Sequence, residues 1–416
     1  MENEVWYKMD NVAKVFLATY NKRDTRSFRV SCTLKEKIDP ELLQKALEAT
    51  VLVRPQFQVS IHKGLFWHYM GVNSKLPVVT EENERPCPVL YGTQKEGQLH
   101  YKVSYFRNRI NLDMFHALSD GNGGMEFLNI IVLHYLQLKY PGKLDQVSML
   151  SGAAADDLEQ DSFRQFYKSG KLSKEKRLKS YHIRGRKLPY DQLQFFELHM
   201  SVQSVLQLAK NAGVSLTSFL GANMMMAIYK DMPLLQRNKP ITISMPVNLR
   251  NYFPSETSRN FFNSVYVSQV LTGKETLEEL AKEFDQKLKQ ELTPDRIRKR
   301  MDNYEKVEQL FFVRMVPLFI KNPVVALFTR QEGENVTAVL SNMGKLQVPG
   351  ELQEYIDGYA GFCSTSNLFM TVCSYQDDLT FGISSCYRHT SVLKSFVRQL
   401  ANQGVEVKLY ATDVVK

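Results

Sequence analysis

The chain has 416 residues, of which 44% are hydrophobic and 23% are charged, an ordinary composition for a globular protein with a large core. It contains no run of about 18 consecutive apolar residues, and its first residues lack the basic start and apolar stretch of a secretory signal. We therefore expect a cytoplasmic protein without a membrane span.

The formal net charge of +9 comes from one segment. Between residues 164 and 190, ten lysines and arginines accompany one acidic residue, Glu175, so the surplus of nine equals the excess of the whole chain. No recognised nucleic-acid-binding module accompanies this segment. We interpret it as a solvated linker that could attract an anionic cofactor or carrier protein, and we do not expect nucleic acid as a partner.

Several classes of enzyme lack their minimum motifs in this sequence. The five cysteines are scattered and include no CxxC pair, so neither a disulfide framework nor a zinc site is predicted. The HExxH, GxSxG and Walker patterns are also absent. We therefore expect no bound metal, and we disfavour zinc-protease, serine-hydrolase and P-loop functions.

The first half of the chain alternates between strand and helix patterns. Asp39 followed by Pro40 is typical of a helix start, and Pro141 followed by Gly142 is typical of a helix end. The patterns predict a strand at 27–34 and a helix at 39–51, followed by a hairpin around Lys63 and Gly64 with strands at 56–62 and 65–70. A second pair of strands at 98–106 and 109–115 and a largely buried helix at 124–140 complete this half.

The second half shows the same alternation after the basic segment. Ser201 and Ser215 are candidate N-caps, and Thr276 with Glu279 forms a capping box. Three helices are predicted to begin after Ser201, Ser215 and Thr276, and a fourth is predicted at 391–403. Strands are predicted at 194–199, 241–247, 261–270, 336–346, 367–375 and 379–387. The whole pattern predicts an α/β (α+β) protein with an N-terminal unit at 1–163, the basic linker at 164–190 and a C-terminal unit at 191–416.

The most informative segment lies between the predicted strand 109–115 and the predicted helix 124–140. His116, Asp120 and Gly121 form an HxxxDG pattern, which suggests a histidine-dependent acyltransferase. Acyl transfer from a thioester needs a base with a pKa near neutrality to accept the proton of the attacking hydroxyl or amine, and imidazole has that pKa. The alternative interpretation is a turn that caps the next helix beside a packed histidine.

The other residues of this segment fit a supporting role. Asp120 is an acceptor-only group in a turn, so it should seek a cation or backbone N–H donors and hold the loop that carries His116. We expect Gly121, Gly123 and Gly124 to stand where the backbone passes close to substrate or takes a positive φ.

Four segments in the same order as here resemble the chloramphenicol acetyltransferase-like superfamily: HxxxDG at 116–121, Pro246 to Arg250, Asn260 to Asn263, and Ser341 to Gly344. Within that superfamily the chain is most similar to alcohol acetyltransferases and condensation domains. The resemblance implies two subdomains of mixed sheets with flanking helices, and a channel between them that admits the acyl donor from one side and the acceptor from the other.

The resemblance also implies roles for individual residues. His116 corresponds to the general base, Asp120 to the structural carboxylate of the HxxxDG catalytic segment that ends in Gly121, and Arg250 to the cation that pairs with Asp120. Asn263 and Ser341 are placed on strands that approach the channel, where we expect one of them to donate a hydrogen bond to the oxyanion of the bound substrate.

Two departures from the family narrow the expected reaction. Position 115 is Phe where condensation domains usually carry a second His, which disfavours peptide-bond formation between carrier-bound substrates. The DFGWG element of plant acyltransferases is also absent. The resemblance then implies a stand-alone O- or N-acyltransferase with acyl-CoA as co-substrate, a small-molecule acceptor and no permanently bound cofactor. A condensation-type enzyme that uses acyl carrier protein thioesters, and a non-catalytic binding protein on the same fold, remain alternatives.

Overall fold

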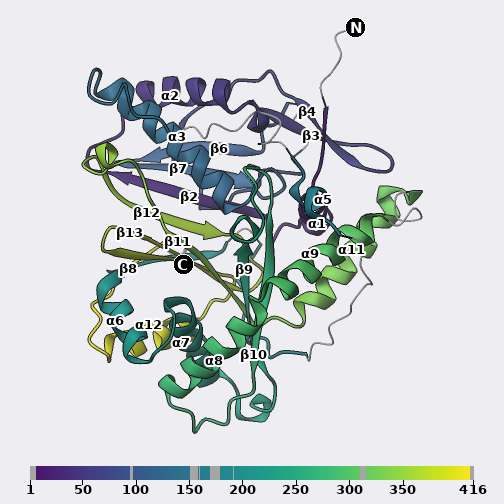
Figure 1. Cartoon of the computed structure of the whole chain (residues 1–416), viewed down its shortest axis with the longest axis vertical. Helices are drawn as coiled ribbons and strands as arrows, with labels where there is room; N and C mark the ends of the chain where they lie inside the picture. The colour runs from purple at the N-terminus through teal and green to yellow at the C-terminus, as the bar shows by residue number, and fades with distance from the viewer. Residues whose placement is uncertain are drawn as a thin grey trace.

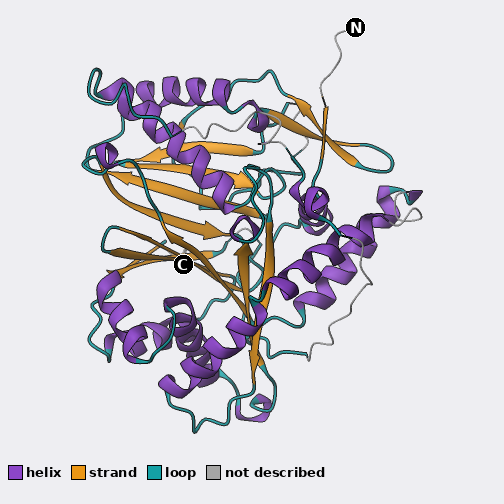
Figure 2. Ribbon diagram, in the orientation of Figure 1, coloured by secondary structure: helices purple, strands orange, loops and turns teal. Residues whose placement is uncertain are grey.

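The computed structural model describes residues 6–93, 97–149, 158, 160–168, 179–190, 192–309 and 315–412. Residues 169–178 of the predicted basic linker lie outside the described residues. Within the described part the strands form one sheet of five strands, one of seven and one of three. Figure 2 shows helices on the outer sides of the two larger sheets, which lie next to each other in the middle of the molecule.

The five-stranded sheet carries the strand that leads into His116. Its order is β12-β2-β7-β6-β5, with bounds Ile356–Cys363, Ser27–Leu34, Arg109–Phe115, Tyr101–Phe106 and Thr80–Glu81. Helices α2 (Pro40–Val53) and α3 (Gly121–Lys139) pack against each other, and α3 also contacts β2 and β7. The predicted strand 27–34 is confirmed without any shift, and Asp39 caps α2 by accepting from the backbone N–H groups of Glu41 and Leu42.

The predicted hairpin forms, but its turn is displaced. β3 (Val59–Lys63) and β4 (His68–Val72) are antiparallel, and β1 (Trp6–Lys8) adds a third strand beside β4. The predicted strand start at 56 is wrong because Pro55 opens a short 3-10 turn, Pro55–Phe57, that buries Phe57. The turn spans residues 64–67, where Gly64 donates its N–H to the carbonyl of Trp67 at 3.0 Å.

The seven-stranded sheet is built from the second half of the chain. Its order is β10-β9-β11-β13-β14-β8-β15, with bounds Phe262–Gln269, Ile241–Asn248, Ala338–Lys345, Leu368–Tyr375, Asp378–Ser385, Gln194–Ser201 and Lys408–Ala411. Four helices cover it: α6 (Val202–Asn211), α7 (Leu216–Asp231), α8 (Leu277–Glu291) and α12 (Ser391–Ala401). Ser201 and Ser215 cap α6 and α7, and the capping box of Thr276 and Glu279 begins α8, as predicted.

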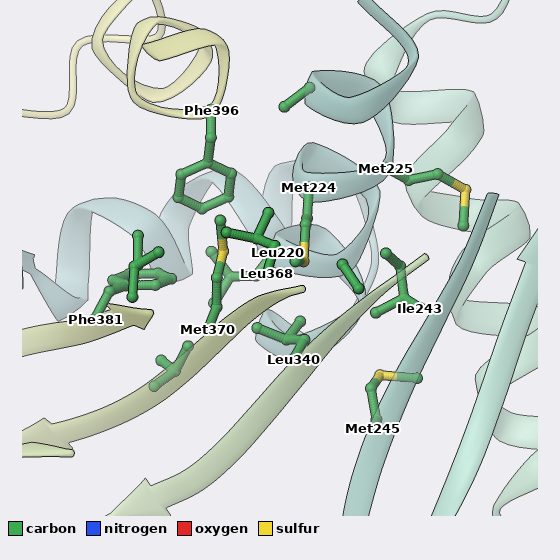
Figure 3. Packing of buried hydrophobic residues seen from close by; sticks show 14 of the residues in the cluster. Leu220, Met224, Met225, Ile243, Met245, Leu340, Leu368, Met370, Phe381 and Phe396 are labelled. Atoms are coloured by element: carbon green, nitrogen blue, oxygen red, sulfur yellow. The ribbon is translucent and has the colours of Figure 1, made fainter. Parts of the chain in front are cut away.

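The core of this half lies between α7, α12 and the sheet. Figure 3 shows Met224 of α7 and Phe396 of α12 pointing toward Leu340, Met370 and Phe381 on the strands. All five of these side chains are almost fully inaccessible to solvent. The methionines of α7 therefore serve as core residues, because their flexible side chains fill the space above a twisted sheet.

The two large sheets meet through a strand from the far end of the chain. β12 belongs to the second half of the sequence, yet it pairs antiparallel with β2, with Tyr359 opposite Cys32. It also contacts β13 and β14 of the other sheet. A Cβ on Gly382 would lie 1.7 Å from the carbonyl oxygen of Gly361, so this close approach requires glycine. The division of the chain into units that end at 163 and begin at 191 stays a prediction. β12 belongs in sequence to the predicted C-terminal unit but pairs with a strand of the N-terminal unit.

A polar cluster ties the sheets together beside this contact. Arg109 of β7 donates two hydrogen bonds to Glu197 of β8, at 2.7 and 2.6 Å. The imidazole of His199 lies 2.8 Å from Glu197 and 2.8 Å from Asp378. Burial alone would lower the pKa of His199, but the two carboxylates outweigh it and raise that pKa to about 9. Burial would raise the pKa of Glu197, but hydrogen bonds from His199 and Arg109 lower it to about 2.

This cluster predicts how the stability of the protein depends on pH. Because the pKa of His199 is raised from 6.5 to about 9 on folding, its contribution is complete below pH 6.5 and is lost as the pH rises toward 9. We expect the free energy of unfolding to fall by about 3 kcal/mol across that range. Denaturant titrations at pH 6 and pH 9 measure the change, and the variant His199→Gln should show a smaller one. Equal pH dependence in both proteins would contradict this assignment.

The remaining elements lie at the edges of the two halves. They are α1 (Asn11–Thr19), α5 (Ser162–Phe166), α9 (Pro294–Gln309) and α11 (Leu318–Gly333), which Figure 1 places together on one side of the molecule. Among the described residues no single helix is long and apolar enough to cross a membrane, although α6 and α7, bent by 85° where they join, meet that requirement as a pair.

Candidate active site

His116 stands directly after β7, and its imidazole is held from one side. Its backbone N–H donates to the carbonyl of Arg26 at 2.8 Å. Its Nδ1 lies 3.0 Å from the carbonyl oxygen of Ser119 and 3.3 Å from Oδ1 of Asn260. Both neighbours are acceptors, because the Nδ2 of Asn260 donates to the carbonyl of His116 at 2.9 Å and so turns Oδ1 toward the ring. Nδ1 therefore carries the proton, and Nε2 carries the lone pair.

Three aromatic rings surround the imidazole. Phe16 stacks on it at 4.4 Å between ring centroids, Phe28 lies at 4.9 Å and Phe262 at 5.6 Å. Burial among these rings lowers the pKa of His116, while the charge of Asp120 and the hydrogen bond to Asn260 act in the opposite direction. The imidazole is therefore neutral at pH 7, which is the form that can accept a proton.

Asp120 satisfies both predicted roles at once. Its Oδ1 caps α3 by accepting from the backbone N–H groups of Asn122 and Gly123, both at 3.1 Å. Its Oδ2 accepts from Nη1 of Arg250 at 2.8 Å and from the backbone N–H of Phe261 at 2.9 Å. The carboxylate is 3% exposed. The predicted pairing with Arg250 is confirmed. The helix cap that the alternative interpretation predicted is also present, but Arg250 is not the surface residue which that alternative required.

Arg250 fixes the loop that follows β9. Its guanidinium donates through Nε and Nη2 to the carbonyl of Thr257, at 3.2 and 2.7 Å, and through Nη2 to the carbonyl of Arg259 at 2.7 Å. Its Nη1 donates to Asn248 as well as to Asp120. Only one carboxylate oxygen of Asp120 takes part, so the contact is not bidentate, because the other oxygen caps the helix. Arg250 thus joins the two halves of the chain next to His116.

The glycines of the motif differ in their packing. A Cβ on Gly123 would lie 2.2 Å from Oγ of Ser119, and one on Gly124 would lie 2.5 Å from the ring of Phe28. A Cβ on Gly121 would meet only the methyl group of Met343, at 3.7 Å, which is an ordinary contact. None of the three glycines has a positive φ, so that part of the expectation is wrong. Gly123 and Gly124 approach other groups of the protein closely, whereas Gly121 lines the cavity, and close approach to a substrate stays a prediction.

A cavity of about 2010 Å³ lies between the two halves and reaches this site. It exceeds the range of about 300–1,000 Å³ that is typical of small-ligand pockets, so it has room for two substrates. His116, Asp120 and Gly121 line it from the first half, and Asn263 and Ser341 line it from the second. The structure thus brings the predicted site residues to one cavity, except that Arg250 lies behind Asp120.

Asn263 places an unsatisfied donor in this cavity wall. Its side chain is 3% exposed, and its Oδ1 accepts from the backbone N–H of Ser264 at 2.7 Å. Its Nδ2 has no hydrogen-bond partner among the described residues. A buried N–H without a partner costs about 1–3 kcal/mol, so an acceptor that reached Nδ2 would recover this free energy. Ser341 of β11 is half-buried in the wall of the same cavity.

Three residues of the site were missed from the sequence. Asn260 holds both the ring and the backbone of His116, and Asp10 lies 3.3 Å from the Nδ2 of Asn260. Burial raises the pKa of Asp10 to about 6. Phe16, which stacks on the imidazole, belongs to α1. The signal for α1 was present, because Asp10 precedes an apolar run and accepts from the backbone N–H of Ala13 as an N-cap.

Comparisons with known proteins identify structures of the same fold but no relative in sequence. No protein-family model matches the chain, and no curated protein matches its sequence. Solved structures do match. TRI101 of F. sporotrichioides, in complex with coenzyme A and T-2, aligns over 97% of this chain and 99% of its own with 12% identity and a TM-score of 0.64.

Two further structures extend the comparison. TRI3, the trichothecene 15-O-acetyltransferase from Fusarium sporotrichioides, aligns over 96% of this chain and 94% of its own with 12% identity and a TM-score of 0.63. The first condensation domain of the calcium-dependent antibiotic synthetase covers 97% and 99% with 12% identity and a TM-score of 0.65. The chain therefore has the chloramphenicol acetyltransferase-like fold, which these acetyltransferases and condensation domains share.

Proposed function

We propose that this protein is an acyltransferase that moves an acyl group from acyl-CoA to a hydroxyl or amine group of a small-molecule acceptor. The observation that carries the proposal is the state of His116. Its imidazole is neutral, its Nδ1–H is held by Ser119 and Asn260, and its Nε2 is left for a substrate in a cavity large enough for two. His116 is the one general base in this proposal.

In the proposed reaction the acceptor O–H or N–H donates its proton to Nε2 of His116 as the oxygen or nitrogen attacks the thioester carbon. The negative charge then lies on the former carbonyl oxygen, where Nδ2 of Asn263 or Oγ of Ser341 donates a hydrogen bond. The C–S bond breaks, and the thiolate takes the proton from the imidazolium. Asp120 and Arg250 carry no proton in this scheme, because they position the loop that bears His116.

Acyl-CoA is preferred over a carrier-protein thioester as the donor for two reasons. TRI101, which shares the fold, was solved with coenzyme A. Phe115, which stands where condensation domains usually carry a second histidine, is fully buried and stacks on Tyr91 at 4.9 Å with an interplanar angle of 3°. Its ring belongs to the core and not to the cavity. No permanently bound cofactor is part of the proposal.

A ligand screen followed by a transfer assay tests the function. Acetyl-CoA, longer acyl-CoAs, free CoA and unrelated nucleotides are compared by thermal unfolding, where a donor at 100 times its Kd should add about 2.7 kcal/mol to the stability. Free-thiol release with alcohol and amine acceptors then measures transfer. Thiol release from an acyl carrier protein thioester but not from any acyl-CoA would favour the condensation-type enzyme. Binding without any release would favour a non-catalytic protein.

Removal of the unsatisfied donor should separate rate from stability. We expect Asn263→Ala to lower the rate of acyl transfer by about 10²–10³, because the oxyanion loses a preorganised hydrogen bond. The loss of stability should be limited to about 0.5–1.5 kcal/mol, because Oδ1 of Asn263 accepts one hydrogen bond, from the backbone N–H of Ser264, whereas Nδ2 has no partner among the described residues. Ser341→Ala is the matched comparison on β11, which is separated from β10 by β9 in the same sheet. A full rate in Asn263→Ala with a reduced rate in Ser341→Ala would transfer the role to Ser341.

A further inference from the structure

Large apolar side chains are exposed together beside the cavity. We call this group the apolar rim; its members come from β1, the turn between β3 and β4, and α11: Trp6, Leu65, Trp67, Phe319, Ile320, Val324, Leu327 and Phe328. Trp6 is 54% exposed, Trp67 58% and Phe319 66%. Apart from Leu318, no described residue of α11 is buried, so this mostly apolar helix is not a core element. A contiguous exposed apolar surface of this kind marks an interaction site.

Hydrogen bonds join the parts of the apolar rim into one surface. The backbone N–H of Leu318, at the start of α11, donates to the carbonyl of Leu65 at 2.8 Å. Nζ of Lys321 donates to the carbonyl of Phe66 at 3.1 Å. Trp6 lies opposite Gly71 in the pairing of β1 with β4. Figure 1 shows the tip of the β3–β4 hairpin and α11 on the same side of the molecule.

The apolar rim carries an excess of positive charge. Residues 6–8, 59–72 and 315–333, which make up its three segments, contain four cations, Lys8, Lys63, Lys321 and Arg330, and one acidic residue, Glu332, in the last turn of α11. The chain has two tryptophans, and both belong to the rim. Exposed tryptophans beside aliphatic side chains and cations are characteristic of surfaces that rest in the interface of a membrane with anionic lipids.

We infer that the apolar rim docks on the surface of a membrane that contains anionic lipids. A second copy of the chain fits less well, because a two-fold contact would bring the four cations of each rim together with one acidic residue, Glu332, on each side. Trp6, Trp67 and Phe328 also line the cavity, so docking sets one entrance of the cavity against the lipid. The inference concerns attachment at the surface and does not depend on the proposed acyl transfer.

Intrinsic fluorescence provides a direct test, since both tryptophans lie in the rim. We expect a blue shift, and quenching by brominated lipid, when the full chain meets vesicles of phosphatidylcholine with phosphatidylserine. Co-sedimentation should be weaker with phosphatidylcholine alone and should decrease as salt is added. No shift, no quenching and no co-sedimentation with the anionic vesicles would overturn the inference.

Variants locate the surface without changing the cavity. Ile320 and Leu327 belong to the rim but do not line the cavity, so the double variant Ile320→Asp with Leu327→Asp should lower vesicle partitioning at least tenfold. Leu235→Asp is the matched control, because Leu235 is 96% exposed and lies in another part of the fold. Lys63→Glu should remove most of the preference for phosphatidylserine.

Two outcomes of the variant experiment would overturn the inference. One is equal partitioning of the wild type and the double variant. The other is dimerisation of the wild type without vesicles, measured by light scattering and abolished in the double variant, which would assign the rim to a second copy. If the double variant does not fold, as judged by its thermal unfolding, the fluorescence of the wild type with brominated lipid decides the question alone.

Discussion

Replacement of His116 with alanine should slow acyl transfer by about 10²–10⁴, because the acceptor loses the base that removes its proton. Donor binding and thermal unfolding should remain close to those of the wild type. The ring contributes stacking with Phe16 and hydrogen bonds from one edge, whereas the strand that precedes it is held by its own sheet. Free-thiol release with a competent acceptor measures the rate, and titration of the donor measures binding.

The pH profile distinguishes loss of a base from loss of structure. Burial lowers the pKa of His116, so the neutral base persists below pH 6.5 and the wild-type rate should fall only at lower pH. In His116→Ala the residual rate should lack this acidic fall. His182→Ala is the matched control, since His182 is exposed and does not line the cavity. An undiminished rate in His116→Ala would rule out the assigned base.

Asp120→Asn should produce the second large effect, with a loss of about 3–5 kcal/mol of stability and a lower transfer rate. Both oxygens of Asp120 accept hydrogen bonds, two at the start of α3 and two from Arg250 and Phe261. An asparagine can turn its oxygen to one pair of donors only, so its NH₂ group would face the other pair. Arg250 would also lose its buried counter-charge.

Asp39→Asn is a control matched in chemistry. Asp39 caps α2 through one oxygen, is exposed and has no arginine partner in the described structure, so asparagine should replace it at little cost. Arg250→Ala should reproduce both effects of Asp120→Asn, because it leaves the carboxylate uncompensated. Denaturant unfolding and thiol release measure the two losses. A melting temperature and turnover equal to the wild type in Arg250→Ala would refute the positioning role.

The elements that the sequence predicted well are those with local signals. The caps at Asp39, Ser201 and Thr276 lie next to the helices they begin, and alternation of polarity defines β2 without reference to the rest of the chain. Helix α3 was predicted to begin at 124 but begins at Gly121, because Asp120 is its cap as well as the partner of Arg250.

The features that were not predicted depend on contacts between distant segments. Nothing local to Asn260 indicates that its amide bridges the ring and the backbone of His116, 144 residues earlier in the chain. The same holds for the stacking of Phe16 on His116, which joins residues 100 positions apart, and for the N–H of Asn263 that has no partner among the described residues. The resemblance supplied the pairing of Asp120 with Arg250, which spacing alone could not have supplied.

The late position of β12 in the sequence has a consequence for how the protein is made. β2 pairs on one edge with β7, and its other edge accepts β12. While the ribosome is still translating the second half of the chain, that edge of β2 has free N–H and C=O groups, and such an edge can recruit strands from other molecules. The histidine-bearing sheet is therefore completed only after residue 363 has emerged, so this edge of β2 stays open to strands of other molecules until most of the chain has been made.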